Sequence, residues 1–203
     1  MYLKEVLIDN FRNLKKQKIE FCNKINLIYG LNAQGKSNLI EAIRILSMGR
    51  SFRGSKMSEM VRFGEEYFFI RGIVESDDFY EKKIEFGYKT NGNKIIKLNG
   101  NKLKTRGDIL GHFLTVIFSP EDIGIIKEGP SRRRKYLDSC ISVIDKNYFF
   151  NLIQYNKALS NRNSLLRKVR EEGKGRDLIE VFDDRLSEYG ARIITVSYTH
   201  LRA

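Results

Sequence analysis

A phosphate-binding loop is the clearest chemical signal in this sequence. It matches the pattern G-x-x-x-x-G-K-[ST] at every fixed position, and its residues are Gly30, Leu31, Asn32, Ala33, Gln34, Gly35, Lys36 and Ser37. Glycines let the backbone wrap around a phosphate without Cβ clashes, so that successive N–H groups and a helix N-terminus face the anion. In this pattern the lysine reaches the β- and γ-phosphates and the hydroxyl ligates Mg²⁺. We therefore predict that residues 30–38, ending with Asn38, bind a nucleoside triphosphate, with Mg²⁺ at Ser37. The alternative is a glycine-rich turn with an incidental lysine.

The segments on either side of this loop are those that a phosphate site needs. Residues 25–29 form a short apolar run that ends at a glycine, which predicts a buried strand entering a tight turn. From Lys36 onward the apolar period changes to 3.6, and Gly49 is placed to close the helix. The apolar face of that helix comprises Leu39, Ile40, Ile43 and Leu46.

The rest of the chain divides into an α/β part and a helical part. Aromatic and β-branched residues predict strands at 67–74, 81–88 and 94–98, and Asn99-Gly100 is typical of a hairpin turn. Beyond residue 119 the patterns are almost entirely helical. We expect Pro130 to begin a helix, a second helix to cover residues 148–169, glycines at 173 and 175 to break it, and a third helix to cover residues 177–195. We expect an α/β lobe at 1–119, with a mixed sheet and antiparallel strands, and a helical lobe at 120–195.

The acidic residue that P-loop hydrolases use to hold Mg²⁺ has no convincing candidate in the sequence. Such proteins need an apolar strand that ends in an acid, and only residues 178–184 resemble one. Glu180 interrupts that run and its apolar residues fall at helical spacing, so we predict that Asp183 and Asp184 lie on a solvated helix face. Hydrolysis by this chain alone is therefore not predicted.

The composition favours a polyanionic partner. The chain has 203 residues with 37 Lys+Arg against 25 Asp+Glu, a formal charge of +12. This surplus suits nucleic acid first and an anionic membrane face second, although a basic surface without function is also possible. No apolar run approaches the roughly 20 residues that span a bilayer. Cys22 and Cys140 form no C-x-x-C pair, so neither a structural zinc site nor a disulfide scaffold is expected, and a reducing cytoplasm is the expected compartment.

Two basic segments could meet such a partner. The first comprises Arg132, Arg133, Arg134 and Lys135. Arginine forks suit DNA phosphates, but a solvated helix face that pairs with nearby acids explains the run equally well. The second comprises Arg162, Arg167, Lys168 and Arg170. It is interleaved with apolar residues, which favours the wet face of an amphipathic helix.

A family resemblance is carried by several motifs taken together. Residues 7–13, LIDNFRN, followed by the P-loop and by NLIEAI at 38–43, resemble the ATPase heads of the SMC/Rad-type proteins. Further stretches are similar to the RecF family of bacterial recombination mediators, namely SPED at 119–122, KEGP at 127–130, RRRKYLD at 132–138, YNKALSNRN at 155–163 and DRLSEYGA at 184–191. The resemblance runs in order from residue 1 to about residue 195.

The resemblance implies an ABC-type ATPase head with an inserted helical lobe and no coiled coil. Members of this family use ATP and Mg²⁺, dimerise around ATP and bind DNA near single-strand/double-strand junctions. With RecO and RecR they help to load RecA at gaps, and they take part in replication and the SOS response. The resemblance implies that Arg12 and Asn13 approach the nucleotide, with Arg12 stabilising phosphate charge, and that residues 119–122 lie near it.

The resemblance also sets limits. The family's signature motif, its acidic pair and its D-loop are expected beyond the last residue given, and residues 196–203 do not continue the family pattern, so we expect a tail there. Two other classes stay open at this point. One is a P-loop nucleotide or metabolite kinase, in which the arginines at 132–134 would serve a lid. The other is a non-catalytic basic DNA-binding module.

Overall fold

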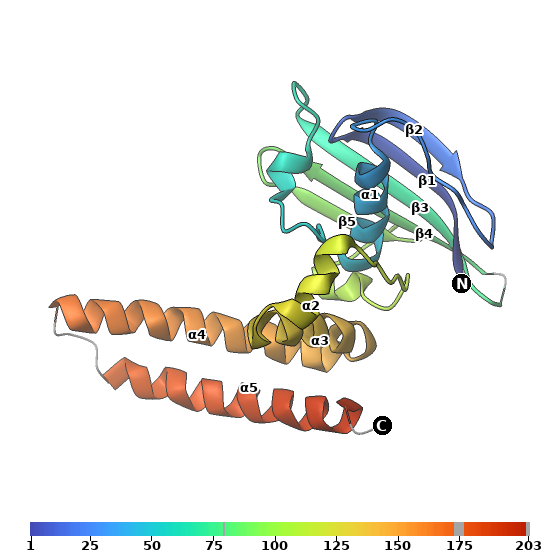
Figure 1. The fold of residues 1–203 in the computed structure, drawn as a ribbon. Coiled ribbons are helices and arrows are strands. Elements are labelled where there is room, and N and C mark those ends of the chain that lie inside the picture. The colour runs from blue at the N-terminus through green and yellow to red at the C-terminus, as the bar shows by residue number, and fades with distance from the viewer. Residues whose placement is uncertain (79, 173–176, 202–203) are drawn as a thin grey trace. The chain divides into compact units, whose positions relative to one another are not determined.

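The computed structural model describes residues 1–78, 80–172 and 177–201 (Figure 1). The chain forms two compact units, Met1–Ile117 and Phe118–Ala203. The first unit holds a six-stranded sheet and one long helix, and the second is helical.

The sheet of the first unit is antiparallel at every pairing in the described chain, in the order β2-β1-β3-β4-β5-β6. The strands are β1 (Tyr2–Phe11), β2 (Leu14–Glu20), β3 (Tyr67–Glu75), β4 (Glu81–Lys89), β5 (Lys94–Leu98) and β6 (Asn101–Lys102). The strands predicted at 67–74, 81–88 and 94–98 are therefore confirmed. Asn99 and Gly100 have φ values of +50° and +83°, as the predicted type I′ hairpin requires.

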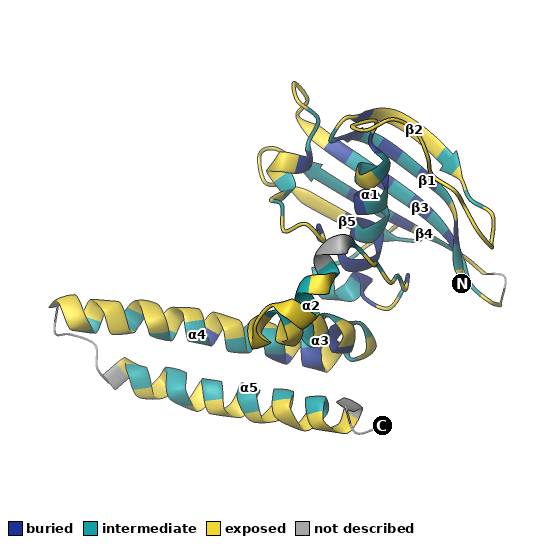
Figure 2. Cartoon of the chain, viewed as in Figure 1, coloured by how far each residue is buried: buried dark blue, intermediate teal, exposed yellow. Residues whose placement is uncertain are grey.

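Helix α1 (Lys36–Met48) packs on one face of this sheet, against β1, β3 and β4. Apolar side chains of the helix and of the strands are buried between them. Four that are fully buried are Ile8, Ile45, Ile70 and Phe86. A Cβ on Gly72 of β3 would come within 2.6 Å of a methyl group of Leu46, so the glycine allows this close approach. Gly49 ends the helix at φ +63°, as predicted. Strand β2, at the sheet edge, is mostly exposed (Figure 2).

The buried strand predicted at 25–29 is wrong. This segment is neither helix nor strand, and the side chains of Ile25, Leu27 and Tyr29 are 89%, 81% and 84% exposed. An apolar run forms a buried strand only where neighbouring strands satisfy its backbone and cover its side chains. No strand of the described sheet pairs with it, so its apolar pattern has nothing to pack against.

Short helical turns complete the first unit and begin the second. They are η1 (Met57–Met60), η2 (Arg106–Ile109), η3 (Pro120–Ile123) and α2 (Gly124–Lys127).

The second unit is built from α3 (Pro130–Ile144), α4 (Lys146–Glu172) and α5 (Asp177–Leu201). Helices α4 and α5 pack along each other, and Arg162 forms an ion pair with Asp183 across them. The hydroxyl of Tyr148 donates to Asp138 Oδ1 at 2.6 Å, and burial raises the pKa of Tyr148 to about 12. Pro130 is the first residue of α3, as predicted.

Two further expectations concern the ends of these helices. Residues 178–184 lie within α5, so the prediction of a helix rather than an acid-ended strand is confirmed. The break predicted at residues 173 and 175 lies outside the described residues. Helix α5 continues through residues 196–201, where a tail was expected.

Candidate nucleotide-binding site

The loop at residues 30–35 adopts a backbone that only a glycine-rich sequence takes readily. Its φ values are +144° at Gly30, +63° at Ala33 and +97° at Gly35. A Cβ on Gly35 would come within 2.7 Å of Leu14 Cδ2 and 2.8 Å of Asn13 Oδ1. Glycine is therefore needed at position 35 both for its backbone conformation and for the space that the β1–β2 turn occupies.

The N-terminus of α1 is prepared for an anion. In the part of the chain that the structure describes, the backbone N–H groups of Lys36, Ser37 and Asn38 donate to no protein group, whereas the N–H of Leu39 donates to Gly35 O at 2.8 Å. Unpaired N–H groups are the rule in a first helical turn, and they carry the positive end of the helix dipole. A phosphate bound here would satisfy them, so the loop fits the group that its sequence predicts.

Lys36 lies over the same loop. Its Nζ donates to Gly30 O at 2.7 Å and to Leu31 O at 2.6 Å. The ammonium group is thus held where it would neutralise a phosphate. Ser37 lies beside it and could ligate Mg²⁺ through its hydroxyl. Among the described residues no cluster of three or more histidine, cysteine, aspartate or glutamate side chains could hold a metal ion.

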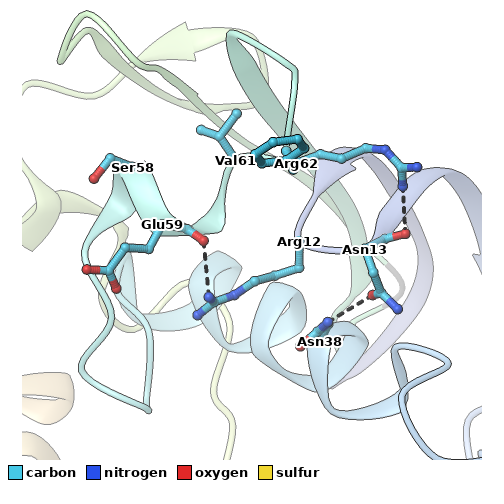
Figure 3. A pocket seen from close by; sticks show the side chains of 8 residues that line it. Arg12, Asn13, Asn38, Ser58, Glu59, Val61 and Arg62 are labelled. Carbon is cyan, nitrogen blue, oxygen red and sulfur yellow. Dashed lines mark hydrogen bonds between the residues drawn. The ribbon is translucent and has the colours of Figure 1, made fainter.

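Asn13 connects the loop to the rest of the unit. Its Nδ2 donates to Ala33 O at 2.8 Å, and its Oδ1 accepts from Asn38 Nδ2 at 2.8 Å. Arg62 donates to the backbone carbonyl of Asn13 at 2.8 Å (Figure 3). One asparagine therefore fixes the P-loop, the start of α1 and the segment after η1 in relation to one another.

Arg12 is held by a buried carboxylate that the motif analysis does not single out. Its Nε and Nη2 donate to the two oxygens of Glu41, at 3.1 and 3.0 Å, and Glu41 is fully buried on α1. Ser51 also donates to Glu41, and Arg12 reaches Ser55 and the carbonyl of Glu59 as well. The charge of Arg12 is therefore compensated by the protein itself. One sequence signal could have identified Glu41, because it is an acidic residue on the buried face of an amphipathic helix and needs a partner there.

A pocket of about 760 Å³ opens beside the loop (Figure 3). Its lining is formed by Arg12, Asn13, Asn38, Ser58, Glu59, Val61, Arg62 and Phe63. Of these, Asn38 ends the predicted nucleotide-binding segment, and Asn13 donates to the loop carbonyl of Ala33. The structure brings the predicted residues Arg12, Asn13 and 30–38 together in one unit.

The predicted DNA-contacting residues lie on α3, in the second unit. Arg132 forms an ion pair with Glu128 one turn earlier, as the alternative of a helix face paired with nearby acids expects. Arg133, Arg134 and Lys135 are exposed, and within the described ranges none of these three has an acidic partner. In the second basic segment, Arg162 is half-buried and pairs with Asp183 of α5. Its other members, Arg167, Lys168 and Arg170, are exposed, as a wet helix face expects.

The structure has an antiparallel sheet that is covered by a helix, and a P-loop leads directly into the first turn of that helix. This arrangement defines a P-loop nucleotide-binding domain. Comparison with known proteins makes this class more specific. The family described as RecF/RecN/SMC N terminal domain matches residues 2–123, and the chain belongs to that family. The resemblance found in the sequence is therefore confirmed.

Relatives at high identity are named DNA replication and repair protein RecF. The chain is 79% identical over 201 residues to the one from Caldanaerobacter subterraneus subsp. tengcongensis, and 63% identical over 202 residues to the one from Thermoanaerobacter pseudethanolicus. These matches cover 99% and 100% of the chain but 55% of each relative. The chain thus spans about half the length of the curated relatives it matches.

Solved structures agree in fold. A structure of the recombination mediator protein RecF-ATP in the RecFOR pathway is 79% identical, with a TM-score of 0.92, and the match covers 99% of this chain and 54% of that one. The RecF-ATPrS structure gives a TM-score of 0.95 at the same identity and coverage. A structure from a study of ATP-driven dimerization of SMC ATPases matches 69% of this chain and 99% of its own, with a TM-score of 0.58 and 23% identity, which shows a shared fold. The predicted α/β ATPase-head fold is confirmed. No helix in the described ranges is long and apolar enough to cross a membrane.

Proposed function

We propose that this chain is the ATP-binding part of a RecF-type DNA replication and repair protein. The observation that carries the proposal is the set of unpaired N–H groups at Lys36, Ser37 and Asn38, with the Lys36 ammonium beside them. A structure of RecF-ATP at 79% identity supports ATP as the nucleotide. Ser37 would ligate Mg²⁺, which shields phosphate charge when it is bound. Membership of the RecF/RecN/SMC family favours this function over the kinase alternative.

In the whole protein, we propose that ATP joins two copies and that the dimer binds DNA near single-strand/double-strand junctions. Action with RecO and RecR, to load RecA at gaps, belongs to the same proposal, as do roles in replication and the SOS response and a cytoplasmic location. The names of the RecF relatives and the place of the RecF structures in the RecFOR pathway support it. Hydrolysis is proposed only for the whole protein, because the segment of this chain that resembles an acid-ended strand, residues 178–184, is helical.

Titration calorimetry with Mg–ATP tests the nucleotide site. We expect Lys36→Ala to weaken ATP binding at least tenfold, because it removes the cation nearest to the phosphates. Lys104→Ala is a matched control, since Lys104 is an exposed lysine of the same unit outside the loop and pocket. Equal ATP affinity in the two variants would contradict the proposal.

The exposed cations of α3 are proposed to contact DNA phosphates. Removing one cation that neutralises a phosphate lowers the dependence of log affinity on log salt by about one. We therefore expect the double variant Arg133→Ala, Arg134→Ala to flatten that slope by about two for a duplex with a single-stranded tail. A slope equal to that of the wild type would return these residues to the role of a solvated helix face.

A further inference from the structure

We propose that the edge of the sheet formed by β5 and β6 is a contact surface for the phosphate backbone of DNA, and that Lys97 and Lys102 are its central contacts. This inference rests on the proposed function, since it concerns the DNA that the whole protein is proposed to bind. It adds a DNA contact on the ATP-binding unit itself, separate from the exposed cations of α3.

This edge lies at the end of the sheet opposite β2 (Figure 1). Residues 89–106, which include both strands, contain six basic residues and no aspartate or glutamate. These six residues, the basic edge, are Lys89, Lys94, Lys97, Lys102, Lys104 and Arg106. The acidic residues that flank the segment are engaged elsewhere. Glu85 forms an ion pair with Lys83 at 3.2 Å. Asp108 accepts from the backbone N–H of Thr105 at 2.7 Å.

The lysines of the basic edge carry charges that the protein leaves uncompensated. Across residues 1–78, 80–172 and 177–201, none of these lysines forms an ion pair with an acidic residue. Lys97 and Lys102 are also direct partners in the antiparallel register of β5 and β6. Like charges directly opposite each other destabilise a strand pair. A polyanion bound at this edge would offset that repulsion.

Cations lie on both faces of this edge. Ile96 is the register partner of Phe86 and is buried, as Phe86 is, so the next residue, Lys97, points to the opposite face of the sheet. Lys94 lies two residues before Ile96 and therefore on the same side as Ile96. Partial burial and the nearby charge of Arg106 lower the pKa of Lys94. A DNA backbone that runs along the edge would thus meet positive charge on either side.

The hairpin that carries the two central lysines is fixed to the neighbouring strand β4. The backbone N–H of Asn99 donates to Lys83 O, and Lys83 N donates to Asn99 Oδ1, both at 2.8 Å. Lysine ammonium groups act as point charges that neutralise phosphates without reading bases. The exposed amides of Asn93 and Asn101 offer further donors to phosphate oxygens. The ligand that fits is therefore a DNA backbone bound without regard to its sequence.

Salt titration of DNA binding by the full-length protein tests this surface, with a duplex that carries a single-stranded tail as the probe. We expect the double variant Lys97→Ala, Lys102→Ala to flatten the dependence of log affinity on log salt by about two, because each lysine neutralises about one phosphate. The matched control is Lys15→Ala, Lys16→Ala. It removes two exposed lysines from β2, at the opposite edge of the sheet, and should leave the slope unchanged.

Stability separates a DNA contact from a structural role. Lys102→Glu would place opposite charges across the strand pair, so this variant should melt at or above the temperature of the wild type. Its salt slope should nevertheless flatten at least as much as that of Lys102→Ala. Aggregation of the double alanine variant with an unchanged slope would mean that the lysines only protect the edge strands from pairing with another chain, which would overturn the inference.

The remaining outcomes separate the two proposals. A double alanine variant with the slope of the wild type would overturn this inference and leave the proposed function standing. Equal flattening in the β2 control would also overturn it, since net charge alone would then explain the effect. Equal competition by a polyglutamate peptide of the same charge as the DNA would assign the edge to an acidic protein instead. If the wild type bound no DNA, the proposed DNA binding would fail, and the inference with it.

Discussion

The phosphate-binding loop has two flanks that are held in different ways. Helix α1 follows the loop and lies against the sheet, with Ile45 fully buried. Residues 21–29 precede the loop as chain without helix or strand, and Ile25 and Leu27 are 89% and 81% exposed. The geometry of the loop is therefore set by α1 and by the turn between β1 and β2, and the preceding segment contributes little to it.

The firm hold on the flank that follows the loop depends first on the buried contact between α1 and the end of β1. Glu41→Ala would leave Arg12 without its carboxylate and should lower the free energy of unfolding of the first unit by about 3–5 kcal/mol, because a part-buried charge loses its partner. Urea denaturation measures this change. Glu66→Ala removes an exposed carboxylate of the same unit and should change stability by less than about 0.5 kcal/mol. A similar small effect of both substitutions would show that the Arg12–Glu41 contact does not hold this flank.

The two flanks should respond very differently to removal of an apolar side chain. Ile45→Ala should cost about 2–5 kcal/mol, since it opens a cavity between α1 and the sheet. Leu27→Ala removes an exposed side chain from the preceding flank and should cost less than about 0.5 kcal/mol. Denaturation of the two variants side by side measures the contrast, and a comparable destabilisation in both would mean that residues 21–29 are packed after all.

A smaller effect on stability is expected at Gly35. Comparison with a second glycine separates the cost of backbone strain from the cost of a clash with the β1–β2 turn. Gly35→Ala and Gly92→Ala both place a Cβ on a residue with positive φ, +97° and +89°, and each should cost about 1 kcal/mol from strain. Only at Gly35 does the new Cβ also meet Asn13 and Leu14. We therefore expect Gly35→Ala to destabilise more than Gly92→Ala and to weaken ATP binding. Equal stability and unchanged ATP affinity in the two variants would argue against a role for this contact.

Local signals account for the features that the sequence predicted correctly. The apolar period of α1, the glycine that ends it, the Asn99-Gly100 turn and the proline that begins α3 each depend on a few neighbouring residues. Motif spacing likewise placed the P-loop at the head of a helix. These signals need no knowledge of the rest of the fold, which is why a single sequence suffices for them.

The features that sequence patterns could not predict depend on contacts between distant residues. The pattern at 25–29 is that of a buried strand, but burial requires neighbouring strands that the described sheet does not provide. Arg12 and Glu41 are 29 positions apart and meet only when β1 and α1 share a face of the unit. The pocket and Phe63 were missed for the same reason, because backbone bonds to Asn10 and Arg12, at the end of β1, bring residues 57–63 to the pocket.

The most direct measurement of the central claim is the response of the backbone amides to Mg–ATP in a ¹⁵N NMR titration. If the phosphates sit on the N-terminus of α1, the amide signals of Lys36, Ser37 and Asn38 should shift furthest, and those of residues 25–29 should shift less. Substitution of Lys36 by alanine should remove these shifts at the same nucleotide concentration. Saturable ATP binding that leaves the three amides unmoved would contradict the account.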